Sequence, residues 1–441
     1  MKITNFLNDT YSEAALYMNF RNTASYVDGL KNAARKVVYT IKKKNIKELQ
    51  KVSALGSEVV KTAEYLHGDS GIQGTIDTMA KNYCGANNLP VLKGTGAFGT
   101  RFTPTAAAAR YIFAEPAEYF NELFKPEDDI NLGNQTFEGH EIEPIYYAPT
   151  LPLLLVNGSE GIGVGFSSDI FPRSIENMFK ATRAKIAKKN LKNEWFVPSW
   201  KGFKGTVELV EGSWIVKGLA IFNGKKVLIE EVPMTWDLQG YTKLLRKLKE
   251  DGKISRFNDY AEDDNFKFEV YLTDEELAKD QDIILKDLGL VKSMTETLTC
   301  IDENNAIREY NNVREIFEDY YKLKIETLKK RIKSEIARLS KEEKDLNETY
   351  KFIMEVIKGT VDMKLKKAEV EKVLKEKKYT IIDKLISLPL YNLTEDKAAE
   401  LKKKWKDKVA ELEQMKLETP ESLWTKDLDA LETKLKKLEI V

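Results

Sequence analysis

The chain has 441 residues, of which 42% are hydrophobic, and its 70 basic and 70 acidic side chains give a formal net charge of zero. This length is enough for about two to four domains with their own cores, and the balanced charge excludes a uniformly basic surface as the sign of a polyanionic partner. Two cysteines are too few for a disulfide framework, and no apolar run approaches the roughly 20 residues of a membrane span, so we expect a cytoplasmic protein with no membrane partner.

Three regions of the chain differ in composition. Residues 1–170 contain short helical patterns broken by glycine-rich turns, which indicates a compact mixed domain. Residues 171–305 alternate strand-like with helical segments and predict a second α/β domain. Residues 306–441 contain little glycine and much Lys and Glu, a composition typical of long helices and coiled coils. The sequence therefore predicts an α+β multidomain protein with boundaries near residues 170 and 305.

The first region begins with basic residues and two short helices. Asp28-Gly29-Leu30 predicts a turn into a helix that carries Lys31, Arg35 and Lys36, although a solvated helix face is the more common explanation for such residues. Residues 56–67 predict a helix that ends at His67. A second helix follows from Asp69, and its predicted apolar face consists of Ile72, Ile76, Met79, Ala80 and Tyr83. Two short helices followed by a glycine-rich turn and a strand are typical of a helix-turn-helix with a wing, but many such pairs bind no DNA.

The predicted wing leads to an Arg-Tyr pair. Residues 105–113 begin as an alanine-rich helix former and end as a strand, with Arg110 and Tyr111 between. A tyrosine hydroxyl has a pKa near 10 and is a weak nucleophile unless positive charge or a base assists it. Arg110 could supply that charge, and His67 could relay a proton. The alternative is that Tyr111 is a core aromatic residue, which on the residues alone is the commoner situation.

The third region predicts two long helices that pair antiparallel. The apolar seam of the first consists of Ile325, Leu328, Ile332, Ile336 and Leu339, followed by Leu346, Tyr350, Ile353 and Ile357. The second helix starts after an N-cap at Thr394, and a last helix starts at Thr419-Pro420. Between the long helices, the apolar residues at 385–391 need a partner, which is either a second copy of the chain or their own hairpin.

Several of these motifs, in this order, resemble the breakage-reunion motifs of type II DNA topoisomerases. They are Asp28-Gly29-Leu30-Lys31 with Arg35, Tyr65-Leu66-His67-Gly68-Asp69-Ser70, the glycine-rich 94–99, Ala107-Ala108-Ala109-Arg110-Tyr111, and the Asn-Gly and Gly-Ile-Gly-Val-Gly segment at 154–165. The segments at 198–205, 388–394, 419–424 and 427–432 are similar to the eukaryotic branch of the family. The length and the end just past the coiled coil are most similar to the medium subunits of phage topoisomerases, which would act in the host cytoplasm.

The resemblance implies a fold and a set of site residues. The fold is a winged-helix DNA-gate domain at 1–170, a tower-like α/β domain at 171–305, and a long antiparallel coiled-coil hairpin with a C-terminal dimer gate at 306–441. Tyr111 would attack a backbone phosphate to form a 5′-phosphotyrosine, while Arg110 and His67 would stabilise that phosphate. Ile162 would wedge between base pairs. The remaining implied DNA contacts are Arg21, Lys31, Arg35, Lys36, Ser70, Arg101 and Asn157.

Two positions depart from the family pattern. Ala34 stands where a phosphate-contacting histidine is expected. The resemblance therefore implies that the contact with DNA at this position is weaker or is made by another residue. Gly74 stands where an acidic residue is expected four places after Ser70, which puts sensitivity to quinolone-type inhibitors in doubt.

The resemblance also implies partners, because the sequence contains no glycine-rich nucleotide loop and no convincing metal site. Asp280-Gln281-Asp282 has a suitable spacing, but a solvated face explains it better. We therefore expect Mg²⁺ and ATP to be bound by a larger ATPase and metal-binding subunit. Two copies of each chain would relax or decatenate double-stranded DNA, with relaxation favoured over the introduction of negative supercoils. One alternative is a non-enzymatic DNA-binding coiled-coil protein, and another is a self-sufficient nuclease that forms a phosphotyrosine.

Overall fold

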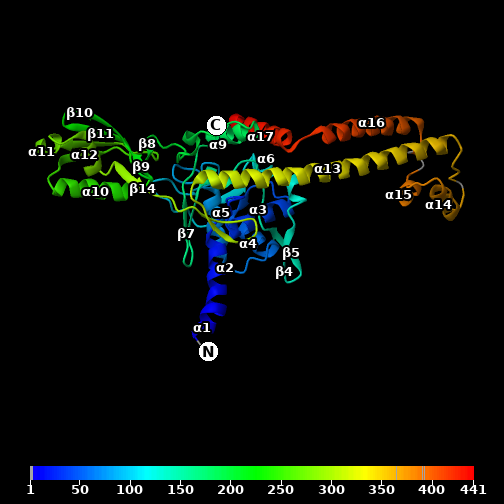
Figure 1. The fold of residues 1–441 in the computed structure, drawn as a ribbon, viewed down its shortest axis with the longest axis horizontal. Coiled ribbons are helices and arrows are strands. Elements are labelled where there is room, and N and C mark those ends of the chain that lie inside the picture. Colours follow the sequence, from blue (N-terminus) through cyan, green and yellow to red (C-terminus); the bar gives the residue numbers. More distant parts are fainter. Residues whose placement is uncertain (1–2, 364, 390, 392) are drawn as a thin grey trace. The chain divides into compact units, whose positions relative to one another are not determined.

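The structure is a computed structural model that describes residues 3–363, 365–389, 391 and 393–441, and it contains two compact units (Figure 1). Unit 1 comprises Met1–Lys324 together with Thr425–Val441, and unit 2 comprises Ile325–Trp424. This division does not separate the first two regions that the sequence distinguishes, and it groups the last 17 residues with unit 1. The three-domain division therefore stays a prediction. Within the described ranges, no helix has the length and apolar character needed to cross a bilayer.

Unit 1 starts with helices followed by a small antiparallel sheet. The helical segments are α1 (Ile3–Asn5), the π-helix η1 (Phe6–Tyr11), α2 (Ser12–Asn22), α3 (Asn32–Lys44), α4 (Val52–Thr62) and α5 (Asp69–Ala80). The strands are β1 (Gln50–Lys51), β2 (Leu92–Thr95) and β3 (Phe113–Pro116), in the order β1-β3-β2. Ile72, Ile76, Met79 and Ala80 of α5 are buried, which confirms its predicted apolar face.

Two local predictions in this part are wrong. The helix predicted to end at His67 ends at Thr62, because Glu64 adopts a left-handed conformation with φ of 49° and the chain leaves the helix there. His67 consequently lies in the loop before α5. The alanine-rich segment after residue 104 forms no helix, and its last residues turn tightly, with the Tyr111 N–H donating to the Ala108 carbonyl at 2.8 Å.

The next part of unit 1 consists of short elements and one longer helix. They are α6 (Phe120–Leu123), α7 (Pro126–Asp129), β4 (Asn134–Phe137), β5 (His140–Pro144), α8 (Leu153–Asn157), the hairpin strands β6 (Ser159–Ile162) and β7 (Ser167–Ile170), α9 (Ile175–Ile186) and η2 (Asn193–Phe196). The pairs β4–β5 and β6–β7 each form a separate two-stranded sheet. The four apolar residues of α8 before Asn157 are buried, and this burial fixes the position of the short helix.

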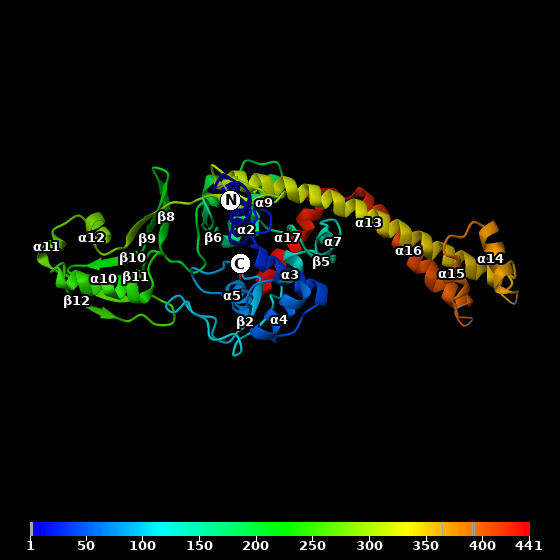
Figure 2. The ribbon, with the colours of Figure 1, turned by 90° about the horizontal axis from the view of Figure 1, so that it is seen from below.

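Residues 206–294 form two further antiparallel sheets, which we call the tower region. Its elements are β8 (Thr206–Val210), β9 (Ser213–Lys217), β10 (Leu219–Asn223), β11 (Lys226–Glu231), α10 (Leu238–Glu250), β12 (Ile254–Asp259), β13 (Phe268–Leu272), α11 (Asp274–Leu277), α12 (Gln281–Asp287) and β14 (Val291–Met294). The orders are β14-β9-β8 and β10-β11-β13-β12. Alternate residues of β11 and β13 are buried against Tyr241, Leu245 and Leu248 of α10, which therefore covers one face of the larger sheet (Figure 2). The pair β15 (Thr299–Ile301) and β16 (Ile307–Glu309) follows.

Unit 2 is built on two long helices. Helix α13 (Val313–Ile357) enters it, α14 (Lys367–Glu376) and α15 (Ile382–Ile386) lie between, α16 (Glu395–Leu417) returns, and α17 (Pro420–Lys437) leaves it. The ion pair between Glu342 and Lys408 at 3.3 Å and the stacking of Tyr350 on Trp405 show that α13 and α16 run antiparallel. Thr394 accepts a hydrogen bond from the Lys397 N–H at 3.3 Å, which confirms the predicted N-cap.

The apolar segment between the long helices packs mainly on its own unit. Leu385 is completely buried in a cluster with Phe352, Leu374 and other side chains of unit 2. In contrast, Tyr391 is 78% exposed. Leu390 and Asn392 of the same segment lie outside the described residues. Leu385 therefore packs within its own hairpin, whereas the Tyr391 side chain is accessible to solvent.

Candidate functional site

The Arg110–Tyr111 pair lies on an exposed turn. The Tyr111 side chain is 68% exposed, and the Arg110 guanidinium lies 5.3 Å from the centre of its ring. The turn is anchored on α4, because the Ser53 N–H donates to the Ala109 carbonyl at 3.2 Å, and Ile112 directly after it is buried. The alternative that Tyr111 is a core aromatic residue is therefore wrong. A fixed positive charge stands beside a phenol that an external phosphate can reach.

His67 has a different environment. Its ring is partly buried, its Nε2 is hydrogen-bonded to the Tyr17 hydroxyl, and the Tyr65 ring stands edge-on at 5.3 Å. Burial, with a further contribution from the positive charge of Arg21, lowers the pKa of His67 below its usual value of 6.5. The imidazole is therefore mainly neutral at neutral pH and can accept a proton. No hydrogen bond, ion pair or ring contact within the described residues joins His67 to Arg110 or Tyr111.

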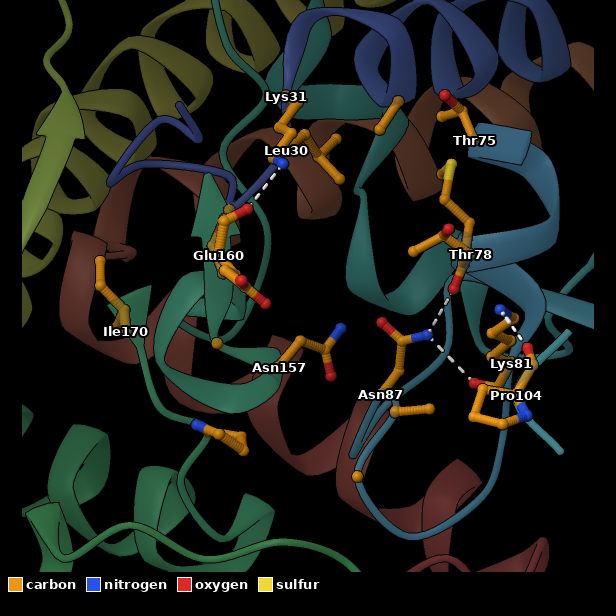
Figure 3. Close-up of a pocket in the computed structure, with 18 of the residues that line it drawn as sticks. Leu30, Lys31, Thr75, Thr78, Lys81, Asn87, Pro104, Asn157, Glu160 and Ile170 are labelled. Carbon is orange, nitrogen blue, oxygen red and sulfur yellow. Dashed lines mark hydrogen bonds between the residues drawn. The ribbon is translucent and has the colours of Figure 1, made fainter. Parts of the chain in front are cut away.

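A large cleft opens between the N-terminal elements and the tower region. It has a volume of about 1080 Å³, and of the predicted DNA contacts, Arg21, Lys31, Arg101 and Asn157 line it together with His67. Figure 3 shows Lys31 beside Glu160 on one wall and Thr75 and Thr78 of α5 on the other. The Lys31 ammonium donates to the Glu160 carbonyl at 2.7 Å, and burial lowers the pKa of Lys31. The lining does not include Ser70, Arg110, Tyr111 or Ile162.

Ile162 occupies the tip of the β6–β7 hairpin with its side chain 76% exposed. The hairpin packs against α2. The Asn22 side-chain amide donates to the Ile162 carbonyl at 2.9 Å, and the Val164 N–H donates to Asn19 Oδ1 at 2.6 Å. A side chain at Gly161 would lie 2.0 Å from the Asn22 carbonyl oxygen. The glycines of Gly-Ile-Gly thus allow the hairpin to approach α2 while the isoleucine projects outward. The Ile162 side chain is therefore not part of a buried strand, the commoner environment for isoleucine in such a glycine-flanked segment.

Three of the basic residues predicted as DNA contacts are buried in ion pairs instead. Arg35 pairs with Asp28, Lys36 with Glu143, and Arg101 with Glu231, each at 2.8 Å. The partner carboxylates are at most 2% exposed, so a cation that turned toward DNA would leave a buried charge unpaired. The burial of these three cations therefore contradicts their predicted role as DNA contacts. The local sequence pattern predicts a solvated or DNA-facing surface for these cations, because their acidic partners are distant in the chain.

Asn157 has a structural contact as well as a place in the cleft. Its side-chain amide donates to the Leu89 carbonyl at 2.9 Å and its Oδ1 accepts from the Leu89 N–H at 2.8 Å. Ser70 is exposed near the start of α5. The sequence analysis did not predict that Tyr17 contacts His67 or that Asn19 and Asn22 hold the β6–β7 hairpin. The spacing of these residues around Arg21 on one helix could have indicated a shared polar surface.

The described residues do not provide a metal site. Within the described ranges, no group of three or more His, Cys, Asp or Glu side chains is close enough together to hold an ion. The binding of Mg²⁺ by another chain stays a prediction.

Comparisons with known proteins identify the class. The family model that describes the A-type subunits of DNA gyrase and topoisomerase IV matches residues 21–429. The chain is 30% identical to mitochondrial DNA topoisomerase 2 of Dictyostelium discoideum, over 98% of this chain and 35% of that protein. It is 31% identical to DNA topoisomerase 2 of Drosophila melanogaster, over 96% of this chain and 34% of that protein. A crystal structure of the Plasmodium falciparum topoisomerase II DNA-binding, cleavage and re-ligation domain matches with a TM-score of 0.88 and 28% identity, over 98% of this chain and 64% of that chain.

These matches define a type II topoisomerase breakage-reunion fold. The chain belongs to the family of the A-type subunits of DNA gyrase and topoisomerase IV. It spans about a third of the length of the curated relatives that it matches.

Proposed function

We propose that this chain is the DNA cleavage and rejoining subunit of an ATP-dependent type II DNA topoisomerase. It makes a transient double-strand break, allows a second duplex to pass and rejoins the break, and so relaxes or decatenates DNA. The observation that carries this proposal is the exposed Arg110–Tyr111 pair on an anchored turn, in a chain whose family match covers residues 21–429.

The chemistry follows from the residues of the turn. The Tyr111 oxygen attacks a backbone phosphorus, the bond from phosphorus to the 3′ oxygen breaks, and the 3′ oxygen takes up the proton as a hydroxyl. The resulting 5′-phosphotyrosine stores the bond energy, so rejoining is the reverse step. Arg110 stabilises the charge on the pentacoordinate phosphorus through its planar donors. His67, which is mainly neutral, accepts a proton or holds the phosphate when bound DNA brings the two sites together.

The substrate lies along the cleft and the β6–β7 hairpin. Arg21 and Lys31 supply positive charge in the cleft, and Ser70 supplies a hydroxyl near the start of α5. Ile162 inserts between base pairs and bends the duplex, which its exposure and the polar anchoring of the hairpin on α2 support. In this assignment residues 1–170, with α3 to α5 and the β1-β3-β2 sheet, form the winged-helix DNA-gate domain, and residues 171–305, which include the tower region, form the tower-like domain.

The complete enzyme needs further chains. Two copies of this chain associate, with the antiparallel helices of unit 2 as a coiled coil and its tip as the dimer gate. A larger subunit binds ATP and Mg²⁺, and the assembly acts in the cytoplasm, of the host if a phage encodes it. Light scattering of the purified chain should then give about twice its mass of 50.5 kDa, whereas a monomer at micromolar concentration would contradict the dimer.

The decisive experiment is detergent trapping of a covalent complex. Supercoiled plasmid, Mg²⁺, ATP and the large subunit of the enzyme are mixed with this chain, and protein linked to 5′ DNA ends is measured. Tyr111→Phe should abolish the linkage. The matched control is Tyr260→Phe, which removes the hydroxyl of another exposed tyrosine outside the proposed dimer gate and should leave the linkage unchanged.

Two outcomes contradict the proposal. Equal linkage by wild type and Tyr111→Phe would show that another residue is the nucleophile. Duplex binding without any linkage, in the presence of a competent large subunit, would favour the non-enzymatic DNA-binding protein.

A further inference from the structure

The segment that precedes Tyr111 is inserted into the tower region. Arg101 is only 7% exposed, and its guanidinium donates from Nη1 to Glu231 Oε1 at 2.8 Å and from Nη2 to the Val232 carbonyl at 3.1 Å. Both acceptors belong to the end of β11 and the residue after it. A residue that the sequence assigns to a DNA contact is thus fixed to the tower.

The neighbouring Phe102 reinforces this attachment. Its ring stands edge-on to Phe266 of the tower core at 4.9 Å, and its N–H donates to Asp264 Oδ1 at 3.3 Å. The Arg101 guanidinium also lies 4.7 Å from the centre of the Phe266 ring. The segment therefore makes ionic, aromatic and backbone contacts with the tower.

Glu231 is held firmly on the tower side. Its Oε1 also accepts from the Val232 N–H at 2.9 Å, and its Oε2 accepts from the Lys204 N–H at 3.1 Å. The carboxylate is therefore oriented by the backbone independently of Arg101. A displacement of the end of β11 moves the carboxylate and, with it, the guanidinium.

The path from Arg101 to the nucleophile is short and restrained. Nine residues further along the chain lies Arg110. The Thr103 carbonyl, between them, accepts from the Thr100 N–H at 2.9 Å, and the Pro104 carbonyl accepts from the ammonium of Lys81 at 2.8 Å. The Ala107 N–H donates to the Ala97 carbonyl at 2.9 Å. The loop is consequently fixed to the tower at one end and to α4 at the other.

We propose that Arg101 is a positioning residue that couples the tower to the Tyr111 loop. When bound DNA shifts the tower, the Arg101–Glu231 ion pair transmits the shift through residues 102–109 and sets the position of the Tyr111 hydroxyl. This inference rests on the proposed function for its catalytic consequence, but the mechanical coupling can be measured without DNA.

The first test is hydrogen exchange of the full chain followed by mass spectrometry. Glu231→Gln removes the charge of the pair, and Arg101→Lys keeps the charge but loses the second donor group. Both should accelerate exchange of the Ala107 and Tyr111 amides at least tenfold. The matched control is Glu143→Gln, which makes the same change in the equally buried pair with Lys36 and should leave those amides unaffected.

The second test uses DNA. With the large subunit present, Glu231→Gln should reduce the trapped covalent complex at least tenfold while duplex affinity stays within about twofold. If Arg101 instead contacts DNA, the affinity for duplex DNA should weaken in both Arg101→Lys and Arg101→Ala. In Arg101→Ala the number of ions released on DNA binding, measured from the salt dependence of the affinity, should also fall by about one.

The outcomes separate the two proposals. Unchanged exchange and unchanged covalent complex in Glu231→Gln would overturn the coupling, and so would lost affinity with unchanged exchange. If the wild type forms no covalent complex, the proposed function fails, and hydrogen exchange still decides the coupling. If Glu231→Gln does not fold, as shown by the absence of a cooperative melting transition, hydrogen exchange and covalent trapping of Arg101→Lys decide the coupling instead.

Discussion

Individual basic residues of this chain separate into two groups by what surrounds them. Arg110 is exposed and free to meet a phosphate, whereas Arg35 donates two hydrogen bonds to Asp28 and one to the Leu30 carbonyl. Asp28 additionally accepts from the N–H groups of Leu30 and Tyr147. The carboxylate therefore organises the turn that leads into α3, and Arg35 neutralises it.

This distinction predicts opposite effects on stability and activity. Asp28→Asn should lower the free energy of unfolding by about 3–5 kcal/mol, because it leaves the buried guanidinium of Arg35 without its counterion. Arg110→Gln should change it by less than about 0.5 kcal/mol and abolish the covalent complex. Urea denaturation and detergent trapping measure the two properties. Wild-type stability of Asp28→Asn would contradict the role assigned to the pair.

A carboxyl group in the cleft makes stability depend on pH. Burial, with the negative charges of Glu160 and Glu296, raises the pKa of Asp169 to about 6. Since this folded-state pKa lies above the ordinary value of 3.8, the protonated group favours the fold at low pH. That contribution is lost as the pH rises through about 6.

Asp169→Asn should accordingly stabilise the chain at pH 7.5 by up to about 1 kcal/mol after solvent screening, and have little effect at pH 4. Thermal melts of both proteins across this range measure the difference. The backbone hydrogen bonds between residue 169 and Thr297 do not depend on the side chain, so they are retained. A difference that grows as the pH falls would contradict the sign of this linkage.

At the scale of elements, the β6–β7 hairpin depends on close contact with α2. Gly161→Ala would place a methyl group 2.0 Å from the Asn22 carbonyl oxygen, so the hairpin must move. We expect a loss of about 1–3 kcal/mol in stability and weaker bending of a bound duplex, measured by fluorescence energy transfer between its ends. Gly74→Ala on α5 is the control, because no atom lies within 4 Å of the added carbon. Equal bending by both variants would show that the hairpin contact does not position Ile162.

Local sequence signals predict elements well and predict charged partners poorly. The apolar face of α5 and the N-cap at Thr394 depend on residues within one or two turns, so they can be read directly from the chain. In contrast, Lys36 pairs with Glu143, which is 107 residues away, and nothing local distinguishes it from a solvated lysine. The loop position of His67 was missed for a related reason, because the left-handed Glu64 that ends α4 carries no helix-stop signal.

The candidate site shows the same division. Tyr111 and Arg110 were identified through an ordered series of motifs, and their exposure agrees with an attack on an external phosphate. The contact of Tyr17 with His67 and that of Arg101 with Glu231 join segments that are 50 and 130 residues apart. Such contacts follow from the packing of whole elements, which a single sequence does not reveal.

At the scale of the whole molecule, each compact unit contains a buried hydrophobic cluster made of its own residues. Phe352, Leu374 and Leu385 belong to a buried cluster within unit 2, whereas Ile229 and Tyr241 belong to the core of the tower region in unit 1. Because each cluster contains residues of one unit only, a cavity in one core removes contacts from that unit alone. We therefore expect the two clusters to unfold in separate transitions.

Leu374→Ala should lower the stability of unit 2 by about 2–5 kcal/mol through the lost apolar contacts and the remaining cavity. Calorimetry should show one transition shifted to lower temperature, and hydrogen exchange should assign that shift to peptides from residues 325–424. Ile229→Ala is the reciprocal control, which should shift the transition of unit 1 and leave unit 2 unchanged. If both substitutions instead lowered one common transition, the two units would unfold as one cooperative body, which would contradict this prediction.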